Sequence, residues 1–126
     1  MAIALCGSGK AEAVFKAQAF CSRVTVASAR AHAGSMPSVQ SLMAFSGDGL
    51  VLSSVKKAED GDGMILRYYE AEGKAGRGVV KFLKAPVSAV SMNLLEQPET
   101  GFATVNGNTV NFDFRANGVG NLLVRF

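Results

Sequence analysis

The charged side chains that stand closest together in this 126-residue chain lie in the segment KKAEDGDG, residues 56–63. Calcium-binding loops place oxygen ligands at alternate positions and close with a bidentate acid. Asp60 and Asp62 have the spacing for the start of such a loop. However, Met64 and Leu66 occupy the positions of the next ligands, so the segment predicts a polar hairpin turn and not a calcium site.

The same acidic residues are the first candidates for glycoside hydrolysis. That reaction needs two carboxyl groups about 5–5.5 Å apart for retention, or farther apart for inversion. One of the two also needs a raised pKa, which apolar surroundings supply. Glu59, Asp60 and Asp62 are neighbours on one polar turn and cannot hold a sugar between them. The sequence therefore predicts no catalytic residue in this chain.

Metal and redox sites need clusters that this sequence lacks. It holds 1 histidine, His32, and 2 cysteines, Cys6 and Cys21, without the CxxC spacing of zinc ribbons or thioredoxin-like motifs. A His-rich metal site and a relay through two imidazoles are excluded. Two free thiols are typical of the reducing cytoplasm, which is the location we expect, and an intrachain disulfide is the alternative.

Phosphate and nucleic-acid binding find little support. Residues 7–10 (GSGK) resemble the end of a phosphate-binding loop, but Ala4 and Ala11 stand where that loop needs a glycine and a hydroxyl residue. The 13 Lys and Arg residues are scattered, the net charge is only +3, and 2 tyrosines without tryptophan make a poor stacking surface. We expect no nucleic-acid partner.

Length and composition limit the scaffold that can carry these residues. A chain of 126 residues has room for one domain, and 48% hydrophobic with 18% charged residues is too apolar for a disordered chain. No apolar run approaches the roughly 20 residues that cross a bilayer, so we expect no membrane partner.

The apolar pattern predicts one short helix followed by many short strands. Residues 12–20 (EAVFKAQAF) combine good helix formers with spaced apolar side chains, which favours a helix. Beyond them, turns rich in glycine and aspartate separate short apolar segments. The expected strands cover residues 24–26, 42–45, 51–57, 64–70, 78–83, 87–95, 102–105, 109–114 and 121–126.

The clearest strand is TVNFDF, residues 109–114, where apolar and polar residues alternate. Asn106-Gly107 precedes it, a pair that suits a type I′ hairpin turn. Many short strands at intervals of roughly ten residues predict an all-β fold, namely an antiparallel β-sandwich with one short N-terminal helix. We divide the chain into an N-terminal extension, residues 1–22, and a sandwich domain, residues 23–126.

Residues 51–70, VLSSVKKAEDGDGMILRYYE, closely resemble a segment near the carboxyl end of α-mannosidases of glycoside hydrolase family 38, of the bacterial and cytosolic type. Further likeness, in the same order as in that family, lies in HAGSMP (32–37), KAPV (84–87) and LLEQP (94–98). The resemblance covers about residues 11–126, and it departs at residues 115–119, where the family has a more apolar segment.

This resemblance implies that the chain is the C-terminal β-sandwich domain of such an enzyme. The family's zinc ion, aspartate nucleophile and acid/base belong to an amino-terminal β/α barrel, and no position of this sequence matches those motifs. The implied chain therefore has no catalytic residue, no metal ligand and no cofactor of its own, and is inactive alone. Its implied partner is the catalytic barrel of an α-mannosidase, in cis or in trans.

The resemblance also singles out the hairpin segment as the part that reaches toward the barrel or the substrate. Lys57, Glu59 and Asp60 are candidates for hydrogen bonds or ion pairs to barrel residues or to sugar hydroxyls, with Arg67 and Tyr68 in the same motif. Tyr68 and Tyr69 must face opposite ways on a strand, so only one of them can reach a given surface. The alternative is a solvated turn whose charge pair contributes under ~1 kcal/mol.

Two other functions stay open at this point. A stand-alone carbohydrate-binding module would take mannosides, but such modules usually stack sugars on coplanar aromatic residues, and the chain has no tryptophan. A self-associating module would bury its exposed docking face in a homodimer.

Overall fold

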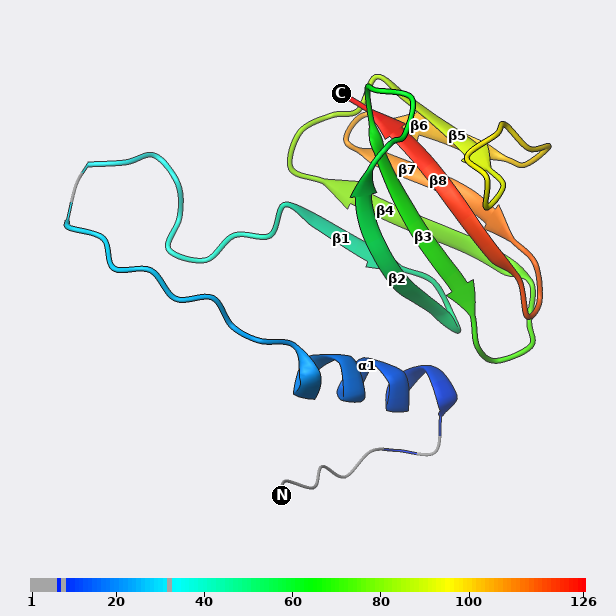
Figure 1. Cartoon of the computed structure of the whole chain (residues 1–126), viewed down its shortest axis with the longest axis horizontal. Helices are drawn as coiled ribbons and strands as arrows, with labels where there is room; N and C mark the ends of the chain where they lie inside the picture. Colours follow the sequence, from blue (N-terminus) through cyan, green and yellow to red (C-terminus); the bar gives the residue numbers. More distant parts are fainter. Residues whose placement is uncertain (1–6, 8, 32) are drawn as a thin grey trace.

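The computed structural model of the chain describes residues 7, 9–31 and 33–126. The sequence arguments that use Cys6, Ser8 and His32 therefore concern positions outside the described residues. The described chain forms one helix and eight strands (Figure 1). The helix is α1 (Lys10–Cys21), and the strands are β1 (Met43–Ser46), β2 (Leu50–Lys57), β3 (Met64–Glu70), β4 (Gly76–Phe82), β5 (Ser88–Met92), β6 (Ala103–Asn106), β7 (Thr109–Phe114) and β8 (Val119–Arg125).

The strands form two four-stranded sheets, with the order β1-β4-β7-β6 in one and β2-β3-β8-β5 in the other. All of these pairs are antiparallel. The sheets face each other across a shared core, so the predicted β-sandwich with one short helix is confirmed (Figure 1). Strands β3 and β7 span the predicted residues, and the other sandwich strands shift by at most three residues at an end.

The core forms because alternate residues of the facing strands point inward. Phe112 on β7 is fully buried, and its ring centroid lies 4.8 Å from that of Tyr68 on β3 and 5.9 Å from that of Phe45 on β1. The alternation predicted for residues 109–114 is confirmed, since its three apolar side chains are all buried. The buried members of this core are Leu50, Leu66, Tyr68, Val80, Phe82, Val110, Phe112, Phe114, Leu122 and Val124.

The second sheet also carries a small apolar cluster on its outer face, made of Ile65, Met92 and Leu123. Strand β8 lies between β3 and β5, and it packs against the main core on one side and this cluster on the other. As a result, four consecutive residues, 121–124, are buried in β8 regardless of which face they point to.

The turn between β6 and β7 is shifted by one residue from the prediction. Asn106 pairs with Thr109 across the hairpin, so the two turn residues are Gly107 and Asn108, and not Asn106 and Gly107. Of these, Gly107 alone has positive φ, +58°. Glycine at the first turn position is the pattern of a type II′ turn, so the expected type I′ turn is wrong. The register places Asn108 where its side chain donates to the Phe82 carbonyl, at 2.9 Å.

In Figure 1, helix α1 lies beside the sandwich without joining its sheets, and residues 22–31 run away from the sheets. Helix α1 includes the predicted residues 12–20 and buries none of its side chains. No helix in the described part of the chain is long and apolar enough to cross a membrane. The strand expected at residues 24–26 is wrong: Val24 and Val26 are 87% and 86% exposed, because no neighbouring strand pairs with them. The first sandwich strand begins only at Met43.

Candidate functional site

The segment singled out by its charges is the hairpin turn between β2 and β3, as predicted. Lys57 pairs with Met64 at the end of the ladder, and the Ala58 N–H donates to the Gly63 carbonyl at 3.0 Å. Gly63 has φ +137°, and a Cβ there would lie 2.7 Å from Leu123 Cδ1. The turn therefore needs glycine at this position, both for its backbone angle and for its close approach to β8.

An ion-pair network braces this hairpin against the loop after β5, residues 93–98. The Lys56 ammonium lies 2.6 Å from Glu59 Oε1 and 2.6 Å from Glu96 Oε1. The second oxygen of Glu96 accepts a hydrogen bond from the Glu59 N–H at 2.9 Å. Glu96 is buried, and its hydrogen bonds with Lys56 and the Glu59 N–H hold the pKa of its carboxyl below the ordinary value. Hydrogen bonds with Glu59 and Glu96 raise the pKa of Lys56.

Asn121 extends the same network across the outer face of the sheet. It is 1% exposed, accepts from Arg67 Nε at 3.0 Å and donates to the Asn93 carbonyl at 2.7 Å. Asn93 in turn accepts from the Leu95 and Gln97 N–H groups at 2.9 and 3.0 Å, which shapes the loop. We call residues 56–63 and 93–98, with Arg67 and Asn121, the braced hairpin.

The five candidate residues from the sequence do not form one cluster. Glu59 belongs to the ion-pair network, whereas the Lys57 and Asp60 side chains are exposed and make no hydrogen bond or ion pair with the described residues. Arg67 is held by Asn121 on the outer face of β3, while its neighbour Tyr68 points into the core. Of the five, Lys57, Glu59 and Asp60 are exposed at the turn, and among these Glu59 alone has an ion-pair partner in the described chain.

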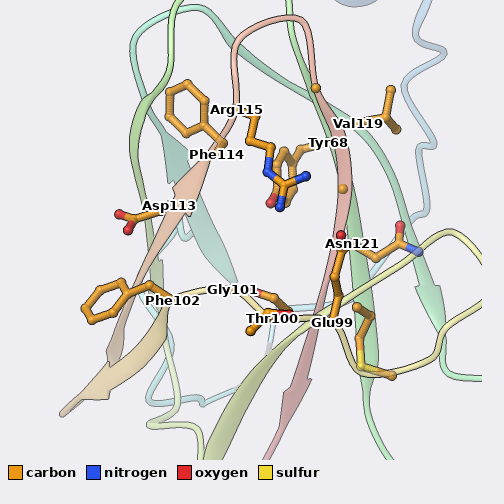
Figure 2. A pocket seen from close by; sticks show the side chains of 14 residues that line it. Tyr68, Glu99, Thr100, Gly101, Phe102, Asp113, Phe114, Arg115, Val119 and Asn121 are labelled. Atoms are coloured by element: carbon orange, nitrogen blue, oxygen red, sulfur yellow. The ribbon is translucent and has the colours of Figure 1, made fainter.

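A second polar region, which sequence reasoning missed, is a groove of about 280 Å³ at the side of the sandwich (Figure 2). We call it the side groove. It opens between β8, the end of β7 and the connection from β5 to β6. It is lined by Tyr68, Ser91, Met92, Glu99, Thr100, Gly101, Phe102, Asp113, Phe114, Arg115, Gly118, Val119, Gly120 and Asn121.

Three side chains point into the side groove, namely the neutral Tyr68, the negative Glu99 and the positive Arg115 (Figure 2). The Tyr68 phenol reaches it because Gly120 has no side chain: a Cβ there would lie 2.7 Å from the Tyr68 hydroxyl. Burial raises the pKa of Tyr68, and the nearby Glu99 carboxylate raises it further. A glycine inside a strand often marks such a close approach, and this was the one sequence signal for the groove.

Glu70 positions the turn that carries Arg115. Its buried carboxylate accepts hydrogen bonds from the Glu72, Gly73 and Asn117 N–H groups at 2.6, 2.8 and 2.7 Å. Burial by itself raises the pKa of this carboxyl, but the backbone hydrogen bonds outweigh burial and lower the pKa. The single side chain thus ties the β3–β4 turn to the β7–β8 turn, residues 115–118, beside the side groove.

Comparison with protein families gives a match to a model described as the glycosyl hydrolases family 38 C-terminal beta sandwich domain. The match covers residues 49–117, more than half of the chain. The chain belongs to this family. The matched region runs from the start of β2 to the β7–β8 turn, so it contains both the braced hairpin's two loops and Arg115. No curated protein matches the chain.

Membership of the family confirms the resemblance seen in the sequence. A family 38 C-terminal sandwich is an accessory domain of a family 38 glycosidase and implies a catalytic domain of the same family as its partner. Within the residues that the structure describes, no group of three or more His, Cys, Asp or Glu side chains is placed to hold a metal ion.

Proposed function

We propose that this chain is the non-catalytic accessory sandwich of an α-mannosidase, lying against a catalytic barrel that cleaves terminal α-mannosides. The observation that carries the proposal is the family match over residues 49–117, which includes six consecutive strands of the sandwich, β2 to β7. The barrel supplies the zinc ion and the acid–base residues, in cis or in trans, and this chain needs no cofactor. We place the assembly in the cytoplasm, which agrees with the exposed free thiol of Cys21.

We further propose that the braced hairpin meets the barrel or the substrate within it. The Lys56–Glu96 ion pair ties this hairpin to the loop after β5, so docking should cost the hairpin backbone little conformational entropy. Lys57, Asp60 and Asp62 remain exposed on its tip and can pair with groups of a partner. A rigid loop with free charges suits a specific polar contact better than a mobile one.

The test mixes the full chain with a family 38 catalytic domain produced without its own C-terminal sandwich. We expect the two to co-elute from a sizing column, and the chain alone to leave p-nitrophenyl α-mannoside uncleaved. The double variant Lys57→Glu, Asp60→Lys should weaken co-elution by reversing both free charges. Lys74→Glu, an exposed lysine in the turn between β3 and β4, is the control and should co-elute like the parent chain.

Two results would contradict the proposal. Hydrolysis of the mannoside by the chain alone, abolished by removing zinc, would show that it is catalytic. Failure of the chain to associate with the catalytic domain would remove the partner. The elution volume of the chain by itself also measures self-association, which stays a prediction from its apolar composition.

A further inference from the structure

The hydroxyl of Tyr68 is the starting point for a second binding site. Tyr68 is 6% exposed, and its ring packs against Phe45 and Phe112 as a phenylalanine would. A tyrosine whose ring lies in a core usually keeps its hydroxyl where that group can form a hydrogen bond. Within the described chain this hydroxyl has none, and it faces the side groove. No side-chain oxygen that is closed off from solvent lacks a partner in the described chain, so this hydroxyl is open to the groove, where water or a ligand can hydrogen-bond to it.

Three exposed polar residues of the side groove are also unpaired within the described chain. The Glu99 and Arg115 side chains and the Thr100 hydroxyl make no hydrogen bond or ion pair with the described residues, although all three line the same groove. Asp113 at the rim differs, since it lies 3.3 Å from Arg77. The groove therefore offers the Glu99 carboxylate as an acceptor, the Arg115 guanidinium as a donor, and the Tyr68 and Thr100 hydroxyl groups.

Charge and size restrict the ligand class. The charges of Glu99 and Arg115 cancel, so the groove favours neither an anion such as phosphate nor a simple cation. A volume of about 280 Å³ is just below the ~300–1,000 Å³ of pockets for drug-sized ligands, which leaves room for one small ring. Adjacent hydroxyl groups on such a ring can both donate to Glu99 and accept from Arg115.

We propose that the side groove binds one neutral sugar ring through hydrogen bonds from its hydroxyl groups to Tyr68, Glu99 and Arg115. The choice of a sugar among neutral polyols rests on the proposed function, since an accessory domain of a glycosidase meets glycans. The site adjoins the braced hairpin, because Asn121 belongs to both, but the Asn121 side chain points away from Tyr68 and Arg115 (Figure 2). It gives the domain a glycan contact of its own.

The test titrates the isotope-labelled full chain with methyl α-D-mannopyranoside and follows the backbone amide resonances. We expect saturable shifts at Thr100, Gly101 and Gly120, with a dissociation constant of about 1 mM or weaker, because each sugar hydroxyl gives up a hydrogen bond to water. Arg115→Ala should weaken binding about tenfold or more, and Tyr68→Phe about threefold. Arg23→Ala, on the exposed segment after α1, is the control and should bind like the parent chain.

Dispersion of the amide spectrum verifies that each variant folds, and Glu99→Gln replaces Arg115→Ala if that variant does not. Absence of saturable shifts, or equal binding by the parent chain and both groove variants, would overturn the proposal. Saturable binding of phosphate or of zwitterionic alanine without binding of the mannoside would overturn it as well. If Arg115→Ala instead abolishes co-elution with the catalytic domain and no sugar binds, the groove is a protein contact, and the proposed accessory role survives.

Discussion

The braced hairpin and the side groove use the same kinds of residue with opposite results. In the hairpin, Lys56 pairs with two carboxylates, and Arg67 is held by Asn121. In the groove, Glu99 and Arg115 stand on one cavity without pairing with the described residues. Paired charges satisfy each other and stiffen a loop, whereas unpaired charges around a cavity are available to a ligand.

This difference also explains why the hairpin dominates a sequence-based search. Charges that are neighbours in the sequence can pair locally, as Lys56 and Glu59 do from positions i and i+3. The groove residues Tyr68, Glu99 and Arg115 come from three distant segments and leave no cluster in the sequence. A dense charged segment therefore indicates a well-braced turn as readily as a binding site.

The largest effect on stability is expected for Asn121, the buried side chain that joins Arg67 to the loop after β5. Asn121→Ala removes the acceptor for Arg67 and the donor to the Asn93 carbonyl, which should lower the free energy of unfolding by about 2 kcal/mol. Urea denaturation of the full chain measures this. Asn111→Ala, whose half-buried side chain makes no hydrogen bond with the described residues, should cost about 0.5 kcal/mol or less. Equal losses of unfolding free energy in the two variants would show that the hydrogen bonds of Asn121 do not stabilise the fold.

Acid should loosen the braced hairpin next. The pKa of Glu96 is lowered in the folded chain from its ordinary 4.5, so the unfolded chain takes up protons first as the pH falls. The stabilisation is present above about pH 4.5 and is lost as the pH falls through the lowered pKa. Urea midpoints between about pH 7 and about pH 3 should fall less steeply for Glu96→Gln than for the parent chain. Superimposable profiles of urea midpoint against pH would show that Glu96 does not contribute to the pH dependence of stability.

The adjacent lysines give a matched test of pairing. Lys56→Met removes the ammonium shared by Glu59 and Glu96 and leaves the buried Glu96 carboxylate without its cation, so the urea midpoint should fall. Lys57→Met removes a charge that has no partner in the described chain, so the midpoint should stay within error. The fall for Lys56→Met should be smaller than that for Asn121→Ala. A larger fall in the urea midpoint for Lys57→Met than for Lys56→Met would contradict the view that the ion pairs of Lys56 stabilise the hairpin.

The smallest effect is expected at the groove. The ultraviolet absorbance of tyrosinate, followed against pH in a Tyr69→Phe background, reports the pKa of Tyr68 alone. Glu99→Gln should lower this pKa only part of the way to its ordinary value of 10.0, because burial is the larger cause and Glu99 the smaller. Asp48→Asn, an exposed acid outside the groove lining, is the control. An unchanged pKa in Glu99→Gln would place Glu99 outside the groove interior.

The sequence by itself determined the strands of the sandwich to within a few residues, the fold class and the family. Alternating apolar residues in TVNFDF specify which side chains face the core, and this signal is local to the strand. The same locality explains the error at residues 24–26, where β-forming residues have no neighbouring strand to pair with. The segment VLSSVKKAEDGDGMILRYYE identified the family, which the match over residues 49–117 confirms.

Only the tertiary structure decided which polar side chains meet. Pairing of β3 with β8 places Tyr68 opposite Gly120. Because Gly120 has no side chain, the Tyr68 phenol can reach the side groove. Glu70 holds the turn that carries Arg115 through a hydrogen bond from the N–H of Asn117, 47 residues away in the chain. Such contacts depend on how whole sheets align, and neither the composition nor the spacing of any one segment contains that information.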